Sequence, residues 1–315
     1  MASFHLPYPK FNSEPKIDFE SSLLFIGSCF SNNIGQLSEN HGFKTLSNPF
    51  GTLFHPEPIL RSLQNSIRES QDIHYIDTPD FVSDWDSAHL LQSATKEAHL
   101  NLILEKRQAI REALSGNSWL FITFGTSIAY RHISSGRLVA NCHKQQADLF
   151  IKESSSSTEM FSKWSGFIHE LIEWNPKLNI VFTVSPVRHT RDGLIENNKS
   201  KARLFVLIEM LMNAHPISYY PSFEILQDSL RDYRFFKEDM VHPNQQAVNE
   251  IWKHFSQSYF SENVQSLSMK ISKLYAAKAH RQMNENEVDK LKLERWIMKQ
   301  KKEIEGLLAT RRKRT

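Results

Sequence analysis

Residues 23–31 read LLFIGSCFS, an apolar run of strand length that breaks at a Gly-Ser pair. Two later runs have the same form, since residues 119–124 precede Gly125 and residues 180–184 precede a Ser-Pro pair. Apolar runs without alternation are typical of strands that are buried on both faces of a parallel sheet. The sequence therefore predicts a parallel sheet whose strands end in small or polar residues.

Helix-period patterns lie between and after these runs, over residues 58–69, 94–114, 158–173, 199–213 and 244–255. Alternation of strands with helices predicts a three-layer α/β/α sandwich around a mainly parallel, doubly wound sheet. Ligands of such sheets bind beyond the carboxyl ends of the strands, where the connections part and helix N-termini face the crevice. Functional residues are therefore expected directly after the apolar runs.

The composition is that of a folded chain, with 40% hydrophobic residues and 21 Phe in 315 residues. This excludes a disordered protein. The 2 cysteines, Cys29 and Cys142, are too few for a disulfide framework, so a reducing compartment and a cytoplasmic location are expected. The first residues lack a secretory signal pattern, and no apolar stretch approaches the ~20 residues that span a bilayer.

Positive charge is concentrated at the end of the chain. From Tyr259 onward there are 14 Lys and Arg against 7 Asp and Glu, whereas residues 1–258 carry 24 against 28. The sequence predicts one α/β domain over residues 1–258 and a basic, extended helix over residues 259–315 that ends in the basic run 311–314. Self-association or an anionic partner is expected for this extension, since it has no motif that reads nucleic acid.

Ser28 has the setting of a nucleophile. A buried strand delivers it into a small-residue turn that opens a helix, whose amides can stabilise negative charge. The same residues could instead form only a compact turn with a helix cap. The neighbouring Cys29 could attack in place of Ser28, although a small buried hydrophobe is the simpler role for it.

A general base with an orienting acid is the second candidate. Asp239 and His242 lie three apart in a loop before Pro243 and a helical pattern. In this arrangement the carboxylate can orient one ring nitrogen while the other faces a nucleophile. An Asp that caps a helix beside a surface His produces the same pattern. The pair therefore indicates a catalytic site only in combination with Ser28.

A serine early and an Asp-x-x-His late follow the chain order of the SGNH (GDSL-like) hydrolase superfamily, and the sequence resembles the GSCFA-domain family more closely. The resemblance covers about residues 22–257 and leaves out the extension. The segments that carry it are residues 27–30, 48–52, 124–126, 139–144, 183–189, 198–202, 220–224, 230–235 and 239–243.

The resemblance implies a flavodoxin-like SGNH hydrolase sheet, with Ser28 as nucleophile, His242 as general base and Asp239 as the acid that orients it. In the superfamily the oxyanion hole uses the amide of the nucleophile and donors from two further blocks. Gly51 is the candidate in the second block.

The third block departs from the superfamily pattern. Residues 125–127 read Gly-Thr-Ser where Gly-x-Asn-Asp is expected, so the asparagine donor is missing there. Thr126 or the nearby Asn141 could replace it. Loss of one donor costs roughly a hundredfold or more in rate.

Cationic side chains are expected at the same crevice. The candidates for substrate binding are Arg188, His189, His143 and Lys144. Together they would favour an anionic substrate or a developing oxyanion. Arg188 could instead pair with a structural carboxylate such as Glu224 or Asp232.

These observations predict a serine-dependent hydrolase or acyltransferase without a cofactor, acting on an O-acyl ester, such as an acetyl ester, of a carbohydrate or small metabolite. The rival is a non-catalytic binding protein on the same scaffold, which recognises a glycan or a protein. Motifs for nucleotide cofactors and zinc proteases are absent. A metal site would need Cys29, Cys142, His143 and His242 to converge without any known ligand spacing, so no metal is expected.

Overall fold

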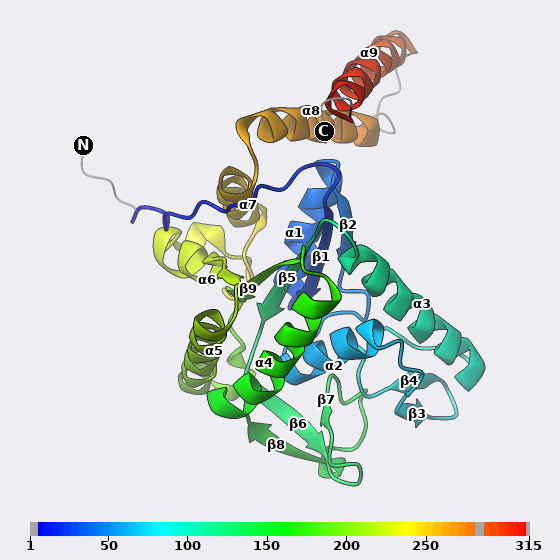
Figure 1. Cartoon of the computed structure of the whole chain (residues 1–315), viewed down its shortest axis with the longest axis vertical. Helices are drawn as coiled ribbons and strands as arrows, with labels where there is room; N and C mark the ends of the chain where they lie inside the picture. The colour runs from blue at the N-terminus through cyan, green and yellow to red at the C-terminus, as the bar shows by residue number, and fades with distance from the viewer. Residues whose placement is uncertain (1–5, 281–286, 313–315) are drawn as a thin grey trace.

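Five parallel strands form the centre of the protein (Figure 1). The computed structural model describes residues 6–280 and 287–312. The strands are β1 (Ser22–Gly27), β2 (Lys44–Ser47), β5 (Ser118–Phe124), β9 (Asn179–Val184) and β10 (Ser218–Tyr219). They lie in the order β10-β9-β5-β1-β2, which is the 2-1-3-4-5 order of flavodoxin-like sheets. The order reverses between β1 and β5, which places the crevice expected for a ligand at the carboxyl ends of these two strands.

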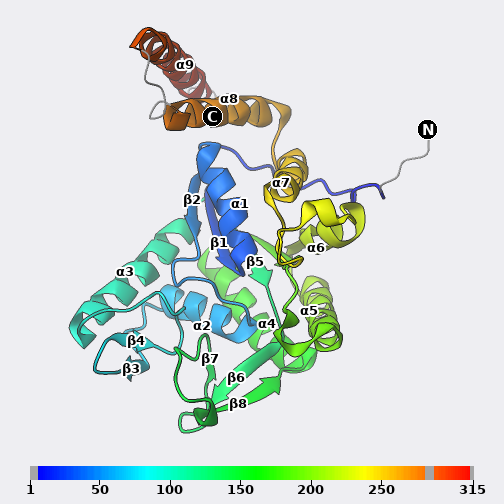
Figure 2. The ribbon, with the colours of Figure 1, turned by 180° about the vertical axis from the view of Figure 1, so that it is seen from behind.

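Helices cover both faces of the sheet (Figures 1 and 2). One face carries α1 (Cys29–Asn40) and α7 (Gln245–Tyr259). The other carries α2 (Pro56–Ile67), α3 (Lys96–Leu114), α4 (Ser157–Trp174) and α5 (Leu194–Ala214). Side chains of a strand alternate between the two cores because successive residues point to opposite faces: Leu23 and Phe25 face α1, whereas Leu24 and Ile26 face the other layer. The predicted three-layer α/β/α fold is confirmed.

Short antiparallel elements were not expected from the sequence. They are the hairpin of β3 (Tyr75–Asp77) with β4 (Val82–Asp84), and a three-stranded sheet of β6 (Ile128–His132), β7 (Leu138–Val139) and β8 (Phe150–Ser154). Most of their residues in β6 and β8 are only half-buried or exposed, so no apolar run marks them. The sheet of β6 to β8 follows β5 directly and stands at the carboxyl end of the main sheet (Figure 1).

Short helical turns complete the domain before α7. They are η1 (Ala147–Leu149), η2 (Thr190–Asp192), α6 (Ser222–Glu224), η3 (Ile225–Ser229) and η4 (Tyr233–Phe235). Of these, η2 follows β9 and leads into α5.

The C-terminal extension forms two helices rather than one. They are α8 (Glu262–His280) and α9 (Glu287–Arg312). Leu267 and Ile271 of α8 are buried with Ile304 of α9, against the partly buried Phe19 of the domain. Burial of these apolar side chains makes a helix pair more stable than a single exposed helix.

The expected boundary at residue 258 falls just before the end of α7, and Tyr259 and Phe260 are still buried in the core of the domain. Of the basic run at residues 311–314, Lys313 and Arg314 lie outside the described residues. Within residues 6–280 and 287–312, no helix has the length and apolar character to cross a membrane.

Gly27 sets how β1 ends. Its φ is +130°, a conformation that side chains rarely adopt, and a Cβ there would lie 2.1 Å from the carbonyl oxygen of Thr123 on β5. The backbones of the two strands can approach this closely only because residue 27 has no side chain. The next residue, Ser28, is thereby placed at the start of α1.

We expect Gly27→Ala to lower the free energy of unfolding by roughly 2–4 kcal/mol, because the added methyl group collides with backbone that cannot move aside. Urea unfolding measures this effect. Gly166→Ala is the matched control, since Gly166 lies within α4 with nothing within 4 Å of its Cβ position. That variant should be more stable by about 0.5–1 kcal/mol. Equal unfolding midpoints for Gly27→Ala and the wild type would contradict the close approach.

Candidate functional site

Ser28 lies at the point where the strand order of the sheet reverses. It is the N-cap of α1, and its Oγ accepts a hydrogen bond of 3.3 Å from the backbone N–H of Phe30. Its own N–H donates to the Thr123 carbonyl at 3.1 Å. Ser28 has 0% exposure, so its hydroxyl is buried at the start of α1 in this conformation.

Asn48, from the loop after β2, holds the turn in which Ser28 lies. Its Oδ1 accepts from the Gly27 N–H at 2.8 Å, and its Nδ2 donates to the Ser28 carbonyl at 3.3 Å. Asn48 is buried and has a φ of +41°, which Asn tolerates better than most residues. The sequence analysis gave it no role, although its place in a turn-forming Asn-Pro pair was a usable signal.

Asp239 and His242 form a hydrogen-bonded pair, as expected. The Oδ2 atom of Asp239 accepts from His242 Nδ1 at 2.7 Å. Its Oδ1 atom accepts from the backbone N–H groups of Val241 and His242, both at 2.9 Å. These hydrogen bonds, those from the backbone first, lower the pKa of Asp239 to about 2. When the neutral ring carries its proton on Nδ1 and donates it to Asp239, the Nε2 atom of His242 has the lone pair that a general base needs.

The loop of Asp239 and His242 lies at the same end of the sheet as Ser28. The N–H of Lys237 donates to the His242 carbonyl at 2.8 Å. The charge of Lys237 acts on the thiol of Cys29, the residue next to Ser28, and the charge of His242 acts on His189. Among the hydrogen bonds of residues 6–280 and 287–312, none joins the Ser28 hydroxyl to His242. The two elements are thus neighbours without the direct contact that proton transfer requires.

Lys201 of α5 is a buried lysine at the centre of the site. Its side chain is 3% exposed, and its Nζ donates to the carbonyls of Gly125 at 2.7 Å and Ser185 at 2.8 Å. Burial, followed by the nearby charge of Arg188, lowers its pKa to about 7. The sequence analysis missed Lys201, although its spacing from Leu204 and Leu211 places it on the buried face of the helix.

The amides expected in an oxyanion hole are already engaged. The N–H of Gly51 donates to the Asn48 carbonyl at 2.7 Å, and that of Thr126 to the Phe54 carbonyl at 3.1 Å. Since the Ser28 amide is bound to Thr123 as well, none of the three expected amides is free in this conformation. The three amides differ from expectation for separate reasons: the Gly51 amide closes the loop after β2, the Ser28 amide pairs with β5, and the Thr126 amide joins the loop after β5 to the loop after β2.

The two remaining candidates for the missing asparagine donor differ. The hydroxyl of Thr126 hydrogen bonds with Ser200 Oγ at 2.9 Å, so it serves to attach α5. The Oδ1 atom of Asn141 accepts from the N–H of His143 at 2.7 Å. That hydrogen bond leaves the Nδ2 of Asn141 without a partner among the described residues, and it is the donor that a ligand could use.

The expected cluster of cations is not formed by the histidines. His143 is 2% exposed, and its ring packs near Trp85 in the interior, away from the crevice. Burial lowers its pKa. Burial, followed by the charge of Lys201, lowers the pKa of His189 to about 4. Both rings are therefore mainly neutral near pH 7. The side chain of His143 is buried, and its two ring nitrogens have no hydrogen-bond partner among the described residues, so its assignment to substrate binding stays a prediction.

Arg188 remains a cation beside the site. Its guanidinium donates to the side-chain oxygens of Gln227, at 3.1 and 3.3 Å, and of Asn198, at 2.8 Å. Glu224 and Asp232, the carboxylates considered as its partners, bind other side chains instead. Amide oxygens orient the guanidinium without neutralising it, so its charge still acts on the crevice.

A cavity of about 580 Å³ adjoins the site. It lies between the sheet of β6 to β8 and η2, and three of the expected site residues, Thr126, Asn141 and His189, line it. The Nε2 atom of His189 is buried and has no hydrogen-bond partner among the described residues. Ser28 and His242 lie outside this lining.

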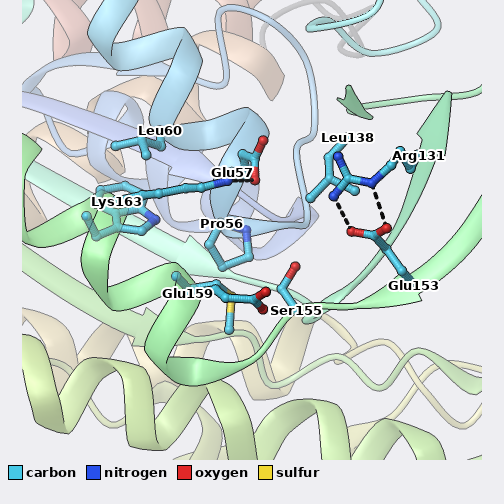
Figure 3. A pocket seen from close by; sticks show the side chains of 11 residues that line it. Pro56, Glu57, Leu60, Arg131, Leu138, Glu153, Ser155, Glu159 and Lys163 are labelled. Atoms are coloured by element: carbon cyan, nitrogen blue, oxygen red, sulfur yellow. Dashed lines mark hydrogen bonds and ion pairs between the residues drawn. The ribbon is translucent and has the colours of Figure 1, made fainter. Parts of the chain in front are cut away.

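A second cavity, of about 110 Å³, lies between α2, α4 and the same small sheet (Figure 3). Its charged side chains are paired: Arg131 with Glu153, and Lys163 with Glu57. Glu159 completes the capping box of α4. None of the expected site residues lines this cavity, and its paired charges indicate a structural role.

The Cys29 thiol is a poor nucleophile in this setting. Burial raises its pKa, which outweighs the opposite effect of Lys201 and Lys237. A raised pKa reduces the thiolate fraction, and the thiolate is the reactive form. Within the described part of the chain, no three His, Cys, Asp or Glu side chains gather as metal ligands would.

Comparison with protein families gives a match over most of the domain. The family model described as the GSCFA family matches residues 22–255, nearly three quarters of the chain. The matched region includes Ser28, Asp239 and His242, and it ends before the two helices of the extension. No curated protein matches the sequence.

The low pKa of His189 makes stability depend on pH. Folding holds this pKa at about 4, below the ordinary histidine value of 6.5, so the unfolded chain binds the proton first as the pH falls. The free energy of unfolding should therefore decrease between about pH 6.5 and about pH 4. Urea unfolding across this range should show a smaller decrease for His189→Gln.

The pKa of His189 also tests the effect of the Lys201 charge on this ring. Lys201→Met removes the charge and should therefore raise the pKa of His189, which NMR of the imidazole protons measures. If the ring titrates at the same pH in both proteins, the charge of Lys201 does not reach it.

Proposed function

The chain belongs to the GSCFA family, and we propose that it is a serine-dependent hydrolase or acyltransferase that acts on an oxygen ester of a carbohydrate or small metabolite. The observation that carries this proposal is the 2.7 Å hydrogen bond between Asp239 and His242, on a loop beside the start of α1. The 2-1-3-4-5 strand order supports a place within the SGNH hydrolase superfamily. Both cysteines are free, which supports a reducing, cytoplasmic setting.

In the proposed reaction, the Nε2 atom of His242 takes the proton of the Ser28 hydroxyl. The Ser28 oxygen then attacks the ester carbonyl, and the leaving alcohol takes the proton from His242. Water or an acceptor hydroxyl next loses its proton to His242 and attacks the acyl-enzyme, and the Ser28 oxygen takes this proton back from His242 as its bond to the acyl group breaks. Both outcomes pass through the same acyl-enzyme, so hydrolysis and transfer share every residue of the site.

Negative charge on the carbonyl oxygen needs a donor other than the engaged amides. The free Nδ2 of Asn141 is the proposed donor. Lys201 is proposed to assist Asn141, because a positive charge that is hydrogen bonded to the Gly125 carbonyl favours a negative charge on the substrate oxygen nearby. Lys201 is thus a positioning residue, since its Nζ binds the protein and not the substrate.

One set of observations favours the second candidate function, a binding protein without turnover. Ser28 has 0% exposure, and its hydroxyl accepts from the Phe30 N–H instead of contacting His242. Catalysis requires the Ser28 side chain to rotate and the crevice to open. A scaffold that only recognises a glycan or a protein requires neither movement.

A fluorophosphonate probe should label the protein covalently, because it reacts with serines that a general base activates. We expect Ser28→Ala to abolish labelling and ester cleavage. Cys29→Ala is the matched control and should keep both, since the Cys29 thiol is mainly protonated. Absence of labelling in a folded wild-type protein would favour the binding function, and loss of labelling in Cys29→Ala alone would assign the attack to the cysteine.

The rate of ester cleavage should also decrease as the pH is lowered. An imidazole loses its basic lone pair on protonation, usually near pH ~6.5, so kcat/KM should fall as the pH decreases through this region. His242→Ala should lower kcat at least about a hundredfold, and Asp239→Asn should lower it too, because the ring loses its orienting acceptor. A flat profile from pH 5 to 8 would contradict the role of His242.

A further inference from the structure

We propose that the 580 Å³ cavity beside the site binds a carboxylate on the substrate, with Lys144 and Arg191 as its cationic ligands. This inference rests on the proposed ester chemistry and adds the class of substrate to it. The substrate would be an ester whose acyl or alcohol part carries a free carboxylate beyond a short apolar segment.

The cavity opens from the catalytic end of the sheet. Phe54 and His189 line it, and their rings meet edge to face at a centroid distance of 4.8 Å. Both rings also lie close to Gly125, since a Cβ on this residue would lie 3.0 Å from Phe54 and 3.2 Å from His189 Nε2. The side chains of Phe54 and His189 therefore stand between a ligand in the cavity and the backbone of Gly125, to which Lys201 is hydrogen bonded.

The charges that line the cavity are positive in sum. Lys144 and Arg191 have no carboxylate partner among the described residues, and both are exposed. Asp192, the carboxylate in the lining, is paired with Lys152 of β8. The lining histidines add no charge near pH 7, because burial lowers their pKa to about 4. Two unpaired cations at one cavity favour an anion.

The backbone directs one of these cations into the cavity. His143 and Lys144 have consecutive positive φ values, 48° and 59°, in a turn closed by the N–H of Gln145 and the carbonyl of Cys142 at 2.9 Å. Such conformations are costly for residues other than glycine and persist where the surroundings impose them, often at binding sites. Here the turn buries His143 in the core and places Lys144 in the cavity lining.

The second cation is held by an aromatic ring. The guanidinium of Arg191 lies 5.6 Å from the ring centroid of Tyr130 on β6. This contact fixes a side chain that would otherwise be mobile, and it leaves the N–H groups of the guanidinium available for a bidentate carboxylate.

The remaining walls explain why the anion should be joined to an apolar segment. They are formed mainly by Ile128, Ala129, Val139, Ala140, Ala147 and Phe150. A volume of about 580 Å³ is that of a site for a small molecule. Apolar walls in the same cavity as the two cations fit a short alkyl chain between the carboxylate and the ester.

The experiment compares two 4-nitrophenyl esters of similar length, the neutral butyrate and the glutarate half-ester with its free carboxylate. The wild type should cleave the half-ester with a kcat/KM at least about tenfold higher, as one charge-assisted contact allows. Arg191→Gln should lose most of this preference while cleavage of the butyrate stays unchanged, and Lys144→Gln should lose most of the preference as well. Lys163→Gln is the matched control, because it removes the same charge from the smaller cavity.

A binding measurement separates this inference from the proposed function. Glutarate should bind the wild type in calorimetry and should bind Arg191→Gln at least about tenfold more weakly, whether or not any ester is cleaved. If the protein cleaves the butyrate but shows neither the preference nor glutarate binding, the inference fails and the ester chemistry stands. If it binds glutarate and cleaves no ester, the ester chemistry fails and the carboxylate site stands. Binding of inorganic phosphate with no binding of glutarate would overturn the choice of a carboxylate.

Discussion

The close approach of β1 and β5 at Gly27 is the constraint on which the site depends. A side chain at this position would meet the Thr123 carbonyl, so only glycine lets the two strands stay in register to their last residues. Ser28 follows at once as the cap of α1. Asn48 closes the other side of the turn with hydrogen bonds to the backbone of both residues. The floor of the crevice is therefore fixed by backbone contacts, which repack less easily than side chains.

Lys201 plays a comparable part for the loops after β5 and β9. A buried amine is costly unless it is hydrogen bonded, and its two carbonyl partners, Gly125 and Ser185, directly follow these two strands. The same charge disfavours a second cation nearby, which is one cause of the low pKa of His189. One side chain thus attaches α5 to the sheet and sets the electrostatics of the crevice.

The hydrogen bonds that make the crevice rigid also limit its chemistry. The amides of Ser28, Gly51 and Thr126 all donate to backbone carbonyls, within one loop, to a neighbouring strand and between two loops. A serine hydrolase uses such amides for its oxyanion. The proposed enzyme must therefore rely on a side-chain donor, Asn141, and on the buried charge of Lys201, which separates it from the superfamily pattern that its motifs resemble.

The sequence by itself determined the three central strands, the helices that cover them and the pairing of Asp239 with His242. Hydrophobic periodicity and short motifs are set by neighbouring residues, so they can be read along the chain. Only the tertiary structure decided that Lys201 is buried, that His143 faces the core while Lys144 faces a cavity, and that the expected oxyanion amides are occupied. Burial, pKa and hydrogen-bond partners depend on groups brought together from distant parts of the chain, and no local pattern encodes them.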